Sequence, residues 1–280
     1  MTNGDGVTPE PVRRDPELVD DNLPGQSAII ELLRLQSAVP PRSSIARLFG
    51  LSPLSAESRV WYEAAVSEIE VGDALARLGD DWVVLHALPV GAGTVDIDHV
   101  VIGPGGVFII NTKNHPGQTV WASQRAFLVS GIRHPYIRNM EYEMGRVERL
   151  LSSAAGVSVE VSGILAIVAA KSITVREKHR DVTVLSTASL VQWLLERAVV
   201  LGPAEIAAIG DSAELAATWQ HDGEPVGDRD ALRERFGQLR AHVRTAWRLQ
   251  VAWTSAATIV GAGGFVLVTY SILLNALGPR

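Results

Sequence analysis

The feature that most constrains this chain is a long stretch near its end that lacks charged side chains. Between Leu249 and Leu277 the sequence holds no Asp, Glu, Lys, Arg or His. At a rise of ~1.5 Å per residue, about 20 apolar residues cross the ~30 Å hydrocarbon layer of a bilayer as a helix. A helix in a globular core normally carries charge on its solvent-facing side. The stretch therefore predicts one transmembrane helix over residues 249–277, with a short tail at 278–280.

Arginines beside this stretch predict its orientation. Arg240, Arg244 and Arg248 precede it at a spacing of four, so they share one helix face, whereas only Arg280 follows it. The positive-inside rule then leaves the large N-terminal part in the cytoplasm, as expected of a single-pass membrane protein. The arginine face is also suited to anionic lipid head groups. The start of the chain has no apolar signal segment, and the absence of cysteine agrees with a reducing compartment.

Composition and the predicted span limit the partners. The formal net charge is −6, so the charge of the whole chain does not indicate nucleic-acid binding. Any nucleic-acid-binding surface therefore has to be local. Within the span, Ala257 and Gly261 are four residues apart, a spacing that permits close helix packing. A homodimer is therefore compatible with the sequence but is not required by it.

The remaining chain divides by composition. Residues 1–26 are rich in Pro, Asp and Gly without apolar periodicity, which predicts a disordered tail. Residues 27–55 are expected to form a short helix and a linker, interrupted by prolines. Residues 56–220 carry regular apolar patterns and are expected to form one α/β domain. Residues 221–248 are interpreted as a polar linker followed by a basic juxtamembrane helix.

Within residues 56–220 the apolar period alternates between that of helices and that of strands. The first helix is expected to start after Ser55 as its cap, with Val60 and Leu75 on its apolar face. The turn Gly103–Gly106 joins two short apolar runs as a hairpin. Helices are predicted at 56–78, 136–154, 189–200 and 203–217, and strands at 82–88, 95–102, 106–112, 161–169 and 182–185. This order of helix, three strands, helix and strand indicates an α/β sandwich with a mixed sheet.

One set of polar residues on this frame is suited to phosphate chemistry. Asp98 lies in the second strand, and Asn111 to Lys113 end the third. Because a tight hairpin joins the two strands, Asp98 is expected near that end. A carboxylate there can hold Mg²⁺ or Mn²⁺, and the Lys113 ammonium can orient an attacking water and stabilise charge on a phosphate. Glu68, on the preceding helix, is a plausible second carboxylate.

At these residues the sequence resembles the NERD (nuclease-related) domain family. Residues 64–68 resemble its first motif, while Ile97–Pro104, Gly106–Phe108 and Thr112–Asn114 resemble its central signature. The resemblance covers roughly residues 60–195. It implies a restriction-endonuclease-like αβββαβ core of the PD-(D/E)XK type and divalent-metal-dependent cleavage of DNA or RNA. It also implies that Glu68, Asp98 and Lys113 occupy the catalytic positions, with Glu68, Asp98 and Asn111 as metal ligands.

Asn111 departs from the family pattern. The (D/E)XK element normally places an acid two residues before the lysine, and an asparagine offers only an uncharged carbonyl oxygen there. The alternative reading is therefore a weakly active or inactive nuclease-like module that binds nucleic acid or a protein partner at the membrane. A structural membrane protein without nucleic-acid contact is a third possibility.

Basic residues follow the predicted hairpin. Those considered for a phosphate-binding surface beside the site are Arg125, Arg133, Arg138 and Lys171. A further group comprises Arg176, Lys178, His179 and Arg180. Both groups are equally compatible with an ordinary solvated surface.

Overall fold

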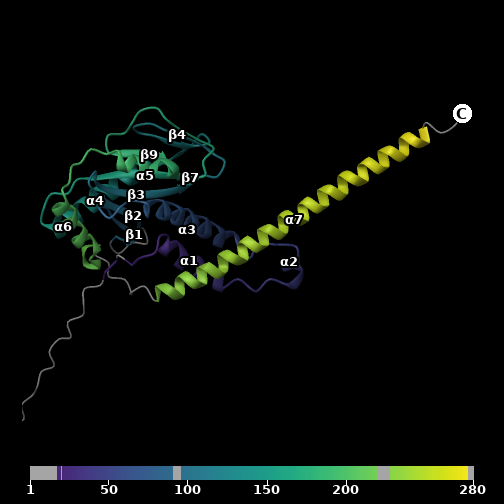
Figure 1. Ribbon diagram of the computed structural model, residues 1–280, viewed down its shortest axis with the longest axis horizontal. Coiled ribbons are helices and arrows are strands. Elements are labelled where there is room, and N and C mark those ends of the chain that lie inside the picture. Colours follow the sequence, from purple (N-terminus) through teal and green to yellow (C-terminus); the bar gives the residue numbers. More distant parts are fainter. Residues whose placement is uncertain (1–17, 20, 91–95, 220–227, 277–280) are drawn as a thin grey trace, which may run out of the picture. The chain divides into compact units, whose positions relative to one another are not determined.

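The computed structural model describes residues 18–19, 21–90, 96–219 and 228–276, and it describes side chains as far as residue 258 (Figure 1). The chain divides into two compact units. The first comprises Met1–Ser27 and Glu63–Pro225, and the second comprises Ala28–Tyr62 and Val226–Arg280.

The elements are bounded as follows. The helices are α1 (Gln26–Ser37), α2 (Ser44–Leu48), α3 (Ala56–Leu75), α4 (Tyr136–Ala155), α5 (Thr187–Leu195), α6 (Pro203–Glu214), the 3-10 helix η1 (Ala216–Trp219) and α7 (Arg229–Ala276). The strands are β1 (Val83–Pro89), β2 (Asp96–Gly103), β3 (Gly106–Asn114), β4 (Thr119–Ala122), β5 (Phe127–Val129), β6 (Ile132–His134), β7 (Val161–Val168), β8 (Ser172–Val175) and β9 (Val182–Ser186).

A five-stranded mixed sheet forms the centre of the first unit, in the order β1-β2-β3-β7-β9. The strands β1, β2 and β3 are antiparallel, and β3, β7 and β9 are parallel to one another. The register Gly103↔Gly106 closes β2 and β3 into the predicted hairpin. Gly106 has a φ of 120°, which side chains rarely allow. The prediction of a mixed α/β fold is therefore confirmed.

Helices cover both faces of this sheet. On one face, Val71 and Leu75 of α3 pack with Phe108 and Ile110 of β3, together with residues of α5. On the other face, residues of α4 and α6 pack against the alternate side chains of β3, Val107 and Ile109. Because side chains alternate along a strand, Asn111 and Lys113 continue the row that faces α4. The sheet thus presents the predicted polar residues to α4 at its edge.

A second sheet was not predicted. It has the order β6-β5-β4-β8. Three of its strands, β4, β5 and β6, lie in the chain between β3 and α4, where no strand was predicted. Strands β4 and β8 are parallel, as β3 and β7 are. Along the chain β4 follows β3, and β8 follows β7. The αβββαβ core is therefore interrupted by a small sheet that extends from the carboxyl ends of β3 and β7.

The predicted N-terminal tail differs from the structure in its last part. Residues 1–17 and 20 lie outside the described residues, but Val19 and Asn22 are buried. The backbone N–H of Val19 donates to the carbonyl of Glu214 at 2.8 Å, and the Asn22 amide donates to the carbonyl of Ala87 at 3.1 Å. Buried Val19 and Leu23 explain why this segment packs within the first unit although the residues around it are polar.

The second unit contains the long helix α7. Trp253 of α7 stacks near Phe49 with ring centroids 5.3 Å apart, and its indole N–H donates to the carbonyl of Leu48 at 2.8 Å. The linker helix and the span, predicted as separate segments at 221–248 and 249–277, form one continuous helix from residue 229 to 276. Residues 220–227 lie outside the described residues.

No helix in the part of the chain whose side chains are described is long and apolar enough to cross a membrane. Most of the predicted span, residues 259–277, lies outside that part.

Candidate active site

The site begins where β2 and β3 separate. Their ladder runs from Gly103↔Gly106 to His99↔Ile110 and ends there, whereas β3 stays paired with β7 as far as Asn114↔Val168. Beyond Ile110, the backbone of β3 therefore lacks its β2 partner. The carboxylate of Asp98 takes that place, because its Oδ2 accepts the backbone N–H of Thr112 at 2.6 Å. Asp98 is thus held beside the Asn111–Lys113 segment, as the hairpin register predicted.

Asn111 and Lys113 have different surroundings on the same row of β3. The Asn111 Nδ2 donates to Oε2 of Glu143 on α4 at 3.2 Å. The Asn111 Oδ1 is buried and has no hydrogen-bond partner among the described residues. The ammonium of Lys113 lies 5.0 Å from the centroid of the Tyr136 ring, a cation–π distance. Lys113 is therefore oriented at the start of α4.

Glu68 joins this set from α3. It is half-buried, whereas Glu63 and Glu70 on the same helix are exposed. Burial raises the pKa of Glu68 well above its usual value, the negative charge of Asp98 raises it further, and Lys113 lowers it. These interactions require Glu68 to lie within Coulomb range of both residues. Of the three neighbouring glutamates, Glu68 is the one that the fold directs at the site.

The local electrostatics favour binding of a cation. Burial raises the pKa of Asp98, while the charge of Lys113 and the hydrogen bonds from Thr112 oppose that shift. Burial also raises the pKa of Glu143, and the amide of Asn111 lowers it. Several carboxylates repel one another in one desolvated region. A nearby positive charge would stabilise the ionised form of each of them. Lys113 supplies only part of that charge.

The donor set fits a hard divalent cation. In the described ranges, no three His, Asp or Glu side chains converge closely enough to hold a metal ion between them. Mg²⁺ is usually held by one or two carboxylates and keeps several waters, so a closed cage is not needed. Asp98 offers a carboxylate, and the buried Oδ1 of Asn111 is an oxygen donor with no partner in the described residues.

The predicted phosphate-binding residues are spread over helix α4, strand β6 and two connecting segments. Arg138 lies on α4 and lines a cavity of about 450 Å³ together with Glu143 and Arg146. Lys171 lies just before β8, and its backbone N–H donates to the carbonyl of Gln118 at 2.8 Å, close after the ends of β3 and β7. Arg125, in the connection between β4 and β5, and Arg133, on β6, lie together, because the Arg133 guanidinium donates to the Arg125 carbonyl at 3.0 Å.

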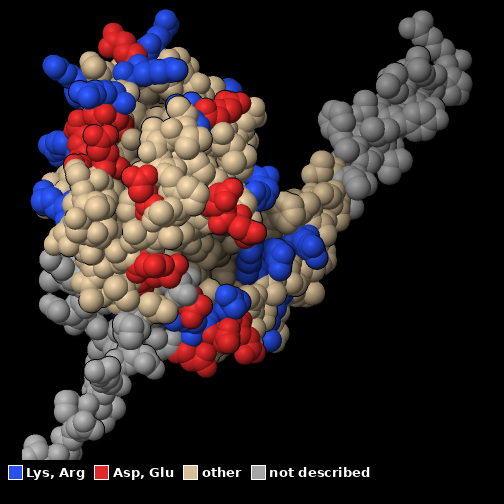
Figure 2. All heavy atoms as spheres, turned by 60° about the vertical axis from the view of Figure 1, so that its left-hand side comes forward, with Lys and Arg blue, Asp and Glu red and all other residues tan. Residues whose placement is uncertain are grey.

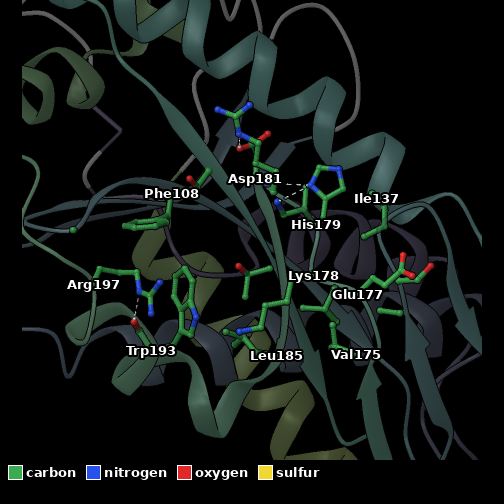
Figure 3. Close-up of a pocket in the computed structure, with 18 residues that line it drawn as sticks. Phe108, Ile137, Val175, Glu177, Lys178, His179, Asp181, Leu185, Trp193 and Arg197 are labelled. Atoms are coloured by element: carbon green, nitrogen blue, oxygen red, sulfur yellow. Dashed lines mark hydrogen bonds and ion pairs between the residues drawn. The ribbon is translucent and has the colours of Figure 1, made fainter.

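The second basic group lines a different cavity. Lys178, His179 and Arg180 border a space of about 490 Å³ that also reaches Gly105, at the start of β3, with Trp193 and Arg197 on its opposite side (Figure 3). Several of its polar groups already have partners. His179 contacts Glu141 at 3.0 Å, and the guanidinium of Arg197 lies 4.1 Å from the Trp193 ring. Gly105 is at the end of β3 opposite Asn111 and Lys113.

The surface shown in Figure 2 carries mixed charge. Lys and Arg side chains alternate with Asp and Glu groups over the drawn face, and no broad field of one sign covers it. This agrees with the net charge of −6. A phosphate-binding surface therefore has to be a local one.

Two residues of the site were missed from the sequence. Asp96 lies two residues before Asp98, and its charge acts on both Asp98 and Glu68. The Asp-x-Asp spacing was a usable signal, because alternate residues of a strand share one face. Glu143 had no local signal, since it meets Asn111 across a separation of 32 residues.

Comparison with known proteins gives one family match. Residues 63–168 match the model of the NERD family, described as the nuclease-related domain. The matched segment contains Glu68, Asp98, Asn111, Lys113 and Glu143. No match was found among curated proteins or among solved structures. The match supports the assignment of this segment to the nuclease-related family.

Proposed function

We propose that the first unit is a nuclease that hydrolyses phosphodiester bonds of DNA or RNA with a divalent cation. The observation that carries this proposal is the position of Asp98 at the separation of β2 and β3, next to Lys113 and within Coulomb range of Glu68. The nuclease-related match over residues 63–168 supports the same class of reaction.

Each residue has a separate task in this proposal. Asp98, Glu68 and the Oδ1 of Asn111 would hold Mg²⁺ or Mn²⁺, whose bound form supplies a nucleophilic water and neutralises phosphate charge. Lys113 orients the attacking water and stabilises the negative charge that develops on the phosphate. Its approach to the Tyr136 ring at 5.0 Å limits the positions of the ammonium. Arg125, Arg133, Arg138 and Lys171 would bind neighbouring phosphates.

A cleavage assay on the purified full chain tests this proposal. Labelled single-stranded DNA, duplex DNA and RNA are incubated with Mg²⁺ or Mn²⁺, and with EDTA as the metal-free reference. Cleavage is expected only with the metal, and Asp98→Ala and Lys113→Ala are each expected to lower the rate at least ~100-fold. Asp211→Ala, which removes an exposed acid on α6, is the matched control. Metal-independent cleavage, or equal rates in all variants, would refute the proposal.

A module that binds nucleic acid without cutting it is the second candidate. It is favoured by one observation, the neutral Asn111 where an acid is usual. In that case the native chain binds oligonucleotides in a salt-sensitive manner but leaves them intact, and Asn111→Asp creates or raises cleavage. Efficient cleavage by the native chain would exclude this candidate.

We also propose that the chain is anchored in a membrane through residues 249–277, with the first unit on the cytoplasmic side. The support comes from the sequence, since that stretch has no charged residue and Arg240, Arg244 and Arg248 precede it. Contact with anionic lipids would contribute about 1 kcal/mol per arginine near the surface. An anchored nuclease acts on nucleic acid that reaches the membrane surface.

A further inference from the structure

We propose that Glu143 of α4 supplies the carboxylate that β3 lacks at Asn111, so that one acid of the site comes from the helix instead of the strand. This inference rests on the proposed nuclease function and deepens it. It assigns to the divalent cation a ligand that the sequence motif does not contain, beside Asp98 and the Asn111 Oδ1. Glu68 then acts on this cation only through its charge, because no three acids of the described residues converge on one point.

The contact between Asn111 and Glu143 is the first argument. The Asn111 Nδ2 donates to Oε2 of Glu143 at 3.2 Å, which brings the helix carboxylate to the position of the missing strand acid. An ionised carboxylate has about four lone-pair sites, and this bond uses one of them. The Asn111 Oδ1 is buried without a partner among the described residues. A cation beside this hydrogen bond would give the Asn111 Oδ1 a partner and would use a remaining lone pair of the Glu143 carboxylate.

The packing of α4 on the sheet is the second argument. Met140, Met144 and Val147 are buried against the sheet and fix the helix on both sides of Glu143. Gly163 of β7 lies directly under Met140, where a side chain on the strand would collide with the methionine. The absence of that side chain lets α4 approach the sheet closely. Glu143 is therefore held at a fixed height above β3.

The surroundings of Glu143 are the third argument. Glu143 lines the cavity of about 450 Å³ that also contains Arg138, Tyr142 and Arg146, and Ile97 borders it from β2. Ile97 is the neighbour of Asp98 in the chain. The carboxylate thus lies between Asn111 on one side and a space with two guanidinium groups on the other. A phosphate in this space would meet both guanidinium groups beside the Glu143 carboxylate.

A purely structural role for Glu143 is the competing explanation. In that case its carboxylate only positions the amide of Asn111, and the cation is bound without it. Glu143→Gln separates the two roles, because the glutamine amide oxygen can still accept the Asn111 N–H but carries no charge. If Glu143 only positions Asn111, then Glu143→Gln binds the cation like the wild type. If Glu143 supplies a ligand charge, Glu143→Gln weakens binding, and Asn111→Asp added to Glu143→Asn returns an acid to the strand.

Mn²⁺ binding to the full chain, followed by electron paramagnetic resonance, measures the ligand role directly. Glu143→Gln and Glu143→Asn are each expected to weaken Mn²⁺ binding at least ~10-fold, as ligand-shell losses do. The double variant Asn111→Asp/Glu143→Asn is expected to recover most of that affinity. Glu148→Gln, the same change at an exposed position of α4, is expected to bind like the wild type. Circular dichroism melting checks that each variant is folded.

The outcomes separate this inference from the nuclease proposal. If Asp98→Ala abolishes Mn²⁺ binding and cleavage while Glu143→Gln changes neither, then Glu143 is not a ligand and the nuclease proposal stands. If Mn²⁺ binding depends on Glu143 but no substrate is cleaved, the ligand assignment stands and the hydrolysis proposal fails. A wild-type chain that binds no Mn²⁺ refutes both.

Discussion

At the scale of single residues, the site concentrates groups that the fold would otherwise avoid. Glu68, Asp98 and Glu143 are acids whose pKa values are raised by burial, and Asn111 carries a buried oxygen without a partner in the described residues. Such groups reduce the stability of the folded state unless a ligand compensates them. Lys113 compensates them only partly. This imbalance favours a binding function over a purely structural one.

A pair of buried histidines beside the site gives a testable pH dependence. The Nδ1 atoms of His86 and His99 lie 2.8 Å apart, so one has to donate while the other accepts, and the pair cannot hold a proton on both atoms. Burial lowers the pKa of His86 to about 4, and it lowers the pKa of His99 well below the usual value. Between pH ~6.5 and ~4 the unfolded chain therefore binds protons that the folded chain does not. Stability falls as the pH falls through this window.

The measurement is urea unfolding followed by circular dichroism at pH 7.5 and pH 5.0. The half-buried His86 is expected to contribute roughly 2 kcal/mol to the loss of stability between these pH values, and the buried His99 contributes in the same direction. His86→Asn, which keeps a polar partner but does not titrate, is expected to remove the contribution of His86. The exposed His242 on α7, changed to Asn, serves as the matched control and leaves the pH dependence unaltered. The prediction is wrong if both variants retain the full pH dependence.

At the scale of elements, the longer ones were predictable and the short ones were not. The central strands, the hairpin at Gly103–Gly106 and helix α4 lie within a few residues of their predicted bounds, because each has a clear apolar period or a strong turn. The small sheet consists of strands of only three or four residues, too short to show a period. Its pairing of β4 with β8 also depends on contacts between distant segments.

The face of α3 shows the same limit. Ser55 accepts the backbone N–H of Ser58 at 3.0 Å and caps the helix as predicted. Val60, assigned to the apolar face, is however 66 % exposed, while Leu75 is fully buried. A helix that begins in one compact unit and ends in another has no single buried stripe for its whole length. Likewise, the hairpin register located Asp98 near Thr112, whereas only the packing of α4 reveals Glu143.

The packing of α4 on β7 is expected to tolerate no added side chain at Gly163. A Cβ there would overlap the side chain of Met140, which is buried and cannot move freely. Gly163→Ala is therefore expected to lower the free energy of unfolding by about 1–3 kcal/mol. The same substitution at Gly145, whose Cβ would meet nothing within 4 Å, is expected to be neutral or to stabilise the helix by up to ~1 kcal/mol. Urea unfolding of the two variants decides between these outcomes, and equal stabilities would contradict the close approach.

At the scale of the whole molecule, a nuclease-related unit and a long helix share one chain. Helix α7 has 48 residues, which corresponds to ~72 Å at 1.5 Å per residue. Its first part carries Arg240, Arg244 and Arg248, and its last part belongs to the uncharged stretch. A helix of this composition can pass from an aqueous surface into a bilayer without a break. The arginine-bearing segment and the proposed anchor therefore belong to one helix.

The proposed orientation is testable by cysteine labelling, since the chain contains no cysteine of its own. Ser158→Cys places a thiol in an exposed loop of the first unit, and Pro279→Cys places one beyond the proposed span. In intact cells a membrane-impermeant maleimide is expected to label the Pro279→Cys variant but not the Ser158→Cys variant. The Ser158→Cys variant is expected to react only after lysis, because the positive-inside rule keeps the arginine flank and the first unit inside the cell. Removal of residues 249–280 should release the protein from the membrane fraction. Labelling of Ser158→Cys in intact cells would reverse the orientation, and a full chain found only in the soluble fraction would refute the anchor.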